Sequence, residues 1–76
     1  MSSIDRNIEF PDNASREAAS KAMYEAGVNT GVRDENNSSN SRGEYYSKLN
    51  VNVEEASGNL SKIRDIAELY GGKVEN

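Results

Sequence analysis

Hydrophobic and polar residues alternate with a period of two near the start of the chain, which predicts a short strand. Within residues 4–10, Ile8 and Phe10 fall on one side and Glu9 falls on the other. Pro11 follows directly, and proline is expected to close a strand because it cannot donate a ladder hydrogen bond. The chain is therefore expected to begin with a strand that has one apolar face.

An alanine-rich segment, residues 11–27, is expected to form the first helix, because alanine has the highest helix propensity. Asp12 or Asn13 can accept a hydrogen bond from the free amides at its start, and Gly27 suits the left-handed turn that ends many helices. One stripe of this helix is apolar and made mostly of small side chains, namely Ala19, Ala22, Met23 and Ala26. Such a stripe allows close approach but buries little area.

Strict alternation returns in the second half of the chain and predicts its clearest strand, EYYSKLNVNVEE, residues 44–55. One face of this strand is apolar and comprises Tyr45, Leu49, Val51 and Val53. The other face is polar and comprises Lys48, Asn50 and Asn52. One side is therefore expected to face a core, and the other to face water or a polar partner.

A second amphipathic helix is expected to follow, capped by Ser57 or Asn59 and running to about Tyr70. Its predicted apolar face comprises Leu60, Ile63, Ile66, Ala67 and Tyr70, and its polar face comprises Ser61, Lys62, Arg64, Asp65 and Glu68. Gly71 and Gly72 are expected to end the helix, and residues 73–76 are a candidate for a very short last strand.

The remaining segments complete a recognisable order of elements. Residues 28–35 are a weak strand candidate, and a polar segment at about 34–44 is expected to be an exposed loop. The order is then strand–helix–strand twice, in one domain spanning residues 1–76. It predicts an α+β fold, a small ferredoxin-like βαββαβ sandwich with two helices on one face of an antiparallel sheet.

Composition narrows the chemistry that this domain could perform. The chain has 76 residues, 34% of them hydrophobic, and it contains no cysteine and no histidine. Disulfides, thiolate metal sites, common zinc sites and imidazole catalysis are thereby excluded. A core this small supplies only about 3–5 kcal/mol of stability. We therefore expect no metal and no cofactor, and association with another protein or with itself.

Charge and hydropathy exclude further classes. The net charge of −4 argues against nucleic-acid binding, and no apolar run is long enough for a membrane span, so a cytoplasmic location is expected. The acidic residues Asp34, Glu35, Glu54 and Glu55 could be paired carboxylates for hydrolysis or Mg²⁺, but a solvated surface is the favoured interpretation. No catalytic residues are expected.

The segment LNVNVEEASGNLSKIRDIAELYGGKV, residues 49–74, resembles the leading half of an ACT domain. That half has an alternating strand, an acidic residue, a glycine turn, a leucine two residues later and a helix that ends in small residues. The family's usual proline before the glycine is Ser57 here. The resemblance implies a dimer that senses an amino acid or a similar ligand, with Gly58, Asn59 and Leu60 at the ligand. The favoured interpretation remains that Gly58 only allows the turn.

The motifs YYSKL and GGKV are also similar to parts of small phycobilisome linker domains, although their separation is longer here. Tyr45, Tyr46 and Tyr70 are candidate partner-binding residues, because tyrosine combines a large contact area with a polar tip. The first functional hypothesis is a small, non-catalytic, acidic protein that binds another protein as an inhibitor, adaptor or assembly subunit. The ACT-like sensor is the alternative, and the linker is the third.

Overall fold

The computed structural model describes residues 5–34, 38–39 and 45–75. These described residues form five strands and three helices. In chain order they are β1 (Asp5–Phe10), α1 (Asn13–Glu25), β2 (Val32–Asp34), β3 (Ser38–Ser39), β4 (Tyr45–Asn52), α2 (Val53–Ala56), α3 (Leu60–Leu69) and β5 (Lys73–Glu75).

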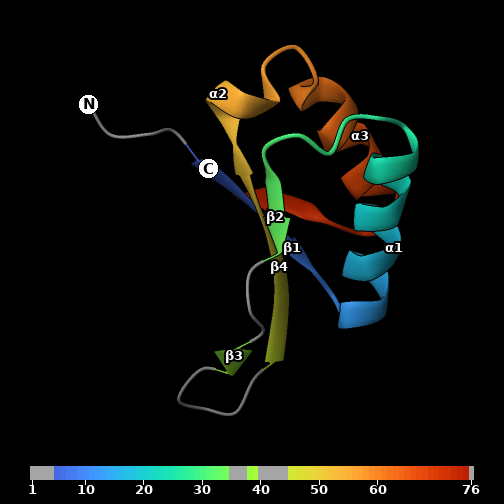
Figure 1. The fold of residues 1–76 in the computed structure, drawn as a ribbon. Helices are drawn as coiled ribbons and strands as arrows, with labels where there is room; N and C mark the ends of the chain where they lie inside the picture. Colours follow the sequence, from blue (N-terminus) through green and yellow to red (C-terminus); the bar gives the residue numbers. More distant parts are fainter. Residues whose placement is uncertain (1–4, 35–37, 40–44, 76) are drawn as a thin grey trace.

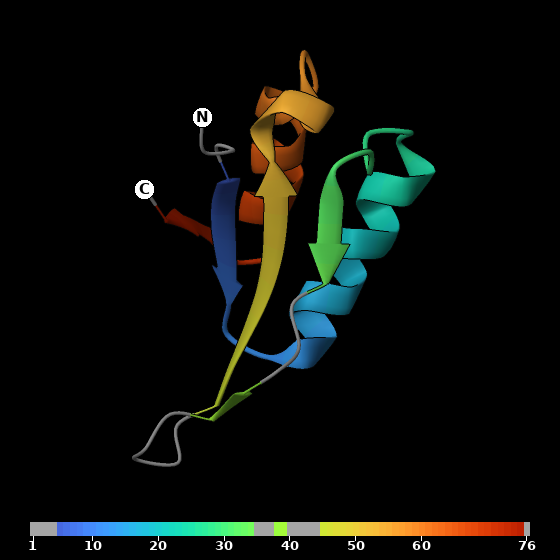
Figure 2. The same ribbon diagram turned by 60° about the vertical axis from the view of Figure 1, so that its left-hand side comes forward.

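Four strands form an antiparallel sheet in the order β2-β4-β1-β5, and β3 pairs separately with the start of β4. The two central strands, β1 and β4, pair along the whole length of β1, from Asp5 opposite Asn52 to Phe10 opposite Ser47. Helices α1 and α3 lie together on one face of this sheet (Figures 1 and 2). The predicted α+β class with an antiparallel sheet is confirmed.

The core lies between the sheet and these two helices. Each central strand contributes alternate residues, and the helices contribute the side chains that meet them. Ile8 and Phe10 on β1 and Leu49 and Val51 on β4 are buried as predicted. Val53 is half-buried and belongs to α2, and the Tyr45 side chain lies outside the described part of the structure. The buried hydrophobic residues are Ile8, Phe10, Ala19, Met23, Val28, Leu49, Val51, Ala56, Ile63 and Ala67. Because three of these residues are alanines, the core depends on a few larger buried side chains, namely Ile8, Phe10, Met23, Leu49 and Ile63.

Helix α1 starts as the sequence predicts. The Asp12 carboxylate accepts a hydrogen bond from the Ser15 amide at 2.7 Å, which satisfies one of the free amides of the first turn. This hydrogen bond holds the pKa of the Asp12 carboxyl below its ordinary value. At the other end Gly27 has φ +75°, so its left-handed turn is also confirmed.

Strand β4 ends at Asn52, three residues before the predicted end, because Val53 begins helix α2. The Asn52 side chain accepts a hydrogen bond from the Glu55 amide at 3.0 Å and therefore caps a helical turn where continued alternation suggested a strand. Of the two caps predicted for α3, Asn59 does occupy the cap position, but its side chain makes no capping hydrogen bond there. Ser57 ends α2 instead.

Helix α3 buries Ile63 and Ala67, half-buries Leu60 and Ile66, and exposes all five residues of its predicted polar face. Gly71, with φ +82°, ends the helix, and the Gly72 amide donates to the Ala67 carbonyl at 2.9 Å. A Cβ atom at Gly72 would lie 2.7 Å from the Phe10 ring, so this position requires glycine for close approach to β1. The short last strand is confirmed as β5.

The expected polar loop at about 34–44 overlaps two strands. Asp34 ends β2, and Ser38–Ser39 form β3, which pairs with Tyr46 and Tyr45. Residues 35–37 and 40–44 lie outside the described part of the chain.

Candidate functional site

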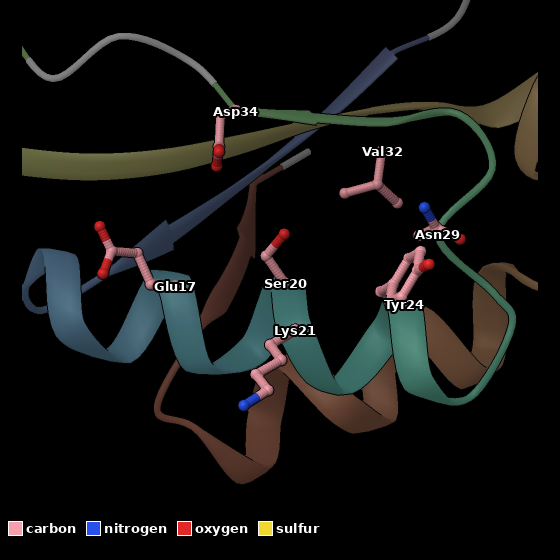
Figure 3. Close-up of a pocket in the computed structure, with 7 residues that line it drawn as sticks. All are labelled: Glu17, Ser20, Lys21, Tyr24, Asn29, Val32 and Asp34. Atoms are coloured by element: carbon pink, nitrogen blue, oxygen red, sulfur yellow. The ribbon is translucent and has the colours of Figure 1, made fainter.

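An open groove of about 370 Å³ lies between helix α1 and strand β2 (Figure 3). Four helix residues and three residues of the following segment line it, namely Glu17, Ser20, Lys21 and Tyr24, and Asn29, Val32 and Asp34. Strand β2 ends the sheet path and pairs only with β4 among the described strands. The groove therefore runs beside a sheet edge, between a helix and a strand that are joined by a short connection.

One end of the groove is built on a buried arginine. Only 7% of Arg16 is exposed, and its guanidinium donates hydrogen bonds to the Ser47 hydroxyl on β4 and the Asp34 carboxylate on β2. A second carboxylate, that of Glu17, lies 3.7 Å from the same guanidinium. The two carboxylate side chains remain well exposed, at 59% for Asp34 and 72% for Glu17. This end therefore carries one positive and two negative charges.

The other end of the groove is more apolar. The ring of Tyr24 rises from the last turn of α1 toward Asn29, and Val32 points from β2 toward the helix (Figure 3). Val32 is half-buried against the core, whereas Tyr24 is 70% exposed. The Lys21 ammonium points away from β2 (Figure 3). An extended side chain in the groove would thus meet an aromatic and an aliphatic surface at one end and carboxylates at the other.

The turn predicted to bind a ligand lies elsewhere, between α2 and α3. Gly58 has φ +75°, and a Cβ atom placed on it would meet no atom within 4 Å. The Asn59 amide donates to the Ala56 carbonyl at 2.9 Å, and Leu60 packs partly against the core. The positive φ gives Gly58 a structural role in the turn. Ligand binding by Gly58, Asn59 and Leu60 stays a prediction.

Of the three predicted partner-binding tyrosines, Tyr70 has a described side chain and does not line the groove. Tyr45 and Tyr46 begin β4, and their side chains lie outside the described part of the structure. Tyr70 caps α3 and is 38% exposed. A Cβ atom on the adjacent Gly71 would lie 3.7 Å from the Pro11 ring, which places Tyr70 near the start of α1. Tyr24 lies in the last turn of α1, so it is about one helix length from Tyr70, or about 18 Å at 1.5 Å per residue.

Sequence reasoning missed the groove residues, for identifiable reasons. Arg16 is a charged residue in an alanine-rich helix, and nothing local indicates that Ser47 and Asp34 will surround it. Tyr24 lies one position beyond the buried Met23, so the periodicity of α1 places it off the core stripe. An exposed tyrosine next to the end of a helix is the one signal in the sequence that favours this surface.

The acidic residues considered above as paired carboxylates are placed as follows. Asp34 is bound to Arg16, and Glu55 lies 3.4 Å from Arg33 at an exposed position, while Glu35 lies outside the described residues. Within the described ranges, no three His, Cys, Asp or Glu residues are grouped so that they could hold a metal ion. The described helices are all too short or too polar to cross a membrane.

None of the known protein-family models matches the chain, and comparisons with curated proteins and with solved structures gave no significant match. The assignment of a site therefore depends on the geometry of this chain alone.

Proposed function

We propose that this protein works without catalysis, by binding another protein as an inhibitor, adaptor or assembly subunit. The observation that carries this proposal is the groove between α1 and the edge strand β2, with Tyr24 exposed at one end. Exposed tyrosines are enriched among the residues that dominate protein interfaces, because one side chain supplies both apolar area and a polar tip.

The shape of the groove favours a macromolecule over a small substrate. Small-molecule sites are usually concave and enclose most of their ligand, whereas this groove is open along its length. The Arg16 guanidinium already donates hydrogen bonds to Ser47 and Asp34. These contacts favour a structural role for the charges of Arg16 and Asp34. The groove thus offers a surface for another molecule to contact.

We also propose that the fold is ferredoxin-like. The strand order β2-β4-β1-β5, the antiparallel pairings and the two longer helices on one face support this arrangement. In that scheme β3 and α2 are additions at the two ends of β4.

Affinity capture from the native host, at low salt and with mass spectrometry, tests the proposed function. The tagged protein is compared with Tyr24→Ala and with Leu69→Ala, which alters another exposed side chain, 82% accessible, that does not line the groove. We expect one defined partner with the unaltered protein and with Leu69→Ala, and about tenfold less of it with Tyr24→Ala. Recovery of no partner, or equal recovery by all three, would contradict the proposal.

A further inference from the structure

The outer edge of β2 presents backbone groups to the groove. In an antiparallel ladder, successive residues direct their amide and carbonyl groups alternately toward and away from the paired strand. The Asn52 amide donates to the Gly31 carbonyl at 2.8 Å, so Gly31 and Arg33 face β4. The backbone groups of Val32 and Asp34 therefore point away from β4. The Val32 amide donates to the Asn29 carbonyl in the preceding turn, and the Val32 carbonyl remains on the outer side.

The same two residues direct their side chains toward α1. Val32 packs partly against the core, and Asp34 reaches Arg16, while Arg33 lies on the opposite face of the sheet. An added strand would therefore place alternate side chains in the groove, one near Tyr24 and Val32 and the next near Glu17 and Asp34 (Figure 3). The first position suits an apolar side chain and the second suits a cation.

We infer that the groove binds an extended segment of the partner protein, which adds as an antiparallel strand to β2 and presents an apolar residue and, two positions away, a lysine or arginine. This inference rests on the proposed function, because it assigns the chemistry of the partner to the same groove. Strand addition supplies affinity through main-chain hydrogen bonds and specificity through alternate side chains. Because β2 has only three residues, two of them charged, indiscriminate pairing is limited and side-chain contacts set the choice.

Charge complementarity favours such a segment over a second copy of this chain. A copy paired through its own β2 would add its own Asp34 and Glu17 carboxylates to a groove that already carries two, and each chain has a net charge of −4. A basic side chain would instead lie near the exposed carboxylates of Glu17 and Asp34.

The test uses a blocked synthetic peptide, threonine-threonine-lysine-threonine-valine-threonine-threonine from its amino end, at millimolar concentrations, followed by backbone amide NMR of the whole protein. In the antiparallel orientation the lysine lies opposite Asp34 and the valine opposite Val32. We expect shifts in β2 and in the facing residues of α1. N-methylation of the valine and lysine amides, which would face β2, should weaken binding at least tenfold, because main-chain hydrogen bonds are lost. N-methylation of the threonines on either side of the valine should leave affinity within about twofold, because those amides face away from β2.

Reversing the charge on the peptide and on the protein distinguishes a change in recognition from a loss of folding. Replacing the peptide lysine with glutamate should weaken binding several-fold, and Glu17→Lys should restore the glutamate peptide while weakening the lysine peptide. Peptides that give no shifts, or equal affinity for both methylated forms, would overturn strand addition. Concentration-dependent shifts of the β2 amides without peptide would overturn it in favour of a second copy. Partner capture that still depends on Tyr24 would leave the proposed function standing in either case.

Discussion

Gly58 occupies the turn between α2 and α3 at φ +75°, where an L side chain is strained even though the space around it is empty. Its requirement for glycine thus comes from the backbone angle. The same conformation recurs at Gly27, again with no atom within 4 Å of an added Cβ. These two positions are therefore matched for strain and differ in the surface that they border.

Gly58→Ala is expected to lower the free energy of unfolding by about 1 kcal/mol, and Gly27→Ala by a similar amount, because both replace a glycine at positive φ. Urea denaturation of both variants measures these changes. We expect the folded Gly58→Ala protein to capture its partner as the unaltered protein does. A folded Gly58→Ala protein that has lost its function would move the ligand-sensing interpretation of this turn to first place.

Asp12 gives α1 a stabilising contribution that depends on pH. Its folded-state pKa is lowered by the hydrogen bond from the Ser15 amide, so ionised Asp12 favours folding above its unfolded pKa. This contribution is lost as the pH falls through the folded pKa. Unfolding at pH 7 and at about pH 3 should show a smaller loss on acidification for Asp12→Asn, which keeps a capping acceptor that does not titrate. Equal losses in both proteins would contradict this role.

Arg16 links three elements, because it extends from α1 to Ser47 on β4 and Asp34 on β2. Arg16→Met is expected to cost about 1–3 kcal/mol, chiefly because the buried Ser47 hydroxyl loses its donor. Asp34 is 59% exposed, and its lost ion pair adds little. Ser47→Ala in the Arg16→Met background should recover part of the loss in a double-mutant cycle. Strictly additive changes would show that the two side chains are not coupled.

Among the elements, α3 shows how burial of one helix face contributes to the free energy of unfolding. Ile63 is fully buried between the sheet and α1, whereas Leu69 on the same helix is 82% exposed. Both are large aliphatic residues, so a comparison of their alanine variants separates the effect of burial from the effect of side-chain type.

Ile63→Ala should lower the free energy of unfolding by about 2–5 kcal/mol, because it removes a buried side chain from a small core. Leu69→Ala should change it by no more than about 0.5 kcal/mol. Urea denaturation or thermal unfolding of the two variants measures the contrast. Similar effects of the two substitutions would mean that α3 packs differently from the arrangement described here.

Alternation and helical periodicity identified β1, α1, β4 and α3 because each of these elements has one continuous apolar face. The same signals did not predict α2, since its single turn depends on the local Asn52 cap and Val53 continues the alternation of β4. The groove was not predicted because it depends on contacts distant in sequence. Arg16 meets Asp34 and Ser47 only after α1 packs across the sheet, and no local pattern encodes that meeting.

On the scale of the whole molecule, the two faces of the sheet differ in what they offer. The inner face is covered by α1 and α3 and forms the core, and the outer face carries Arg33, Lys48 and Asn50 among other polar residues. The Asn50 side-chain amide donates to the Asn7 side-chain oxygen, Oδ1, at 3.0 Å across neighbouring strands of that face. The groove differs from this polar face, because it combines exposed aromatic area with a sheet edge.

The central claim is that the groove between α1 and β2 binds the partner protein. Backbone amide hydrogen exchange of the protein, alone and saturated with its captured partner, tests this claim most directly. We predict slower exchange in the complex at β2, including the Asp34 amide, and at the facing residues of α1, with the α2–α3 turn unchanged. Slower exchange confined to that turn or to the outer face of the sheet, with β2 unaffected, would contradict the account.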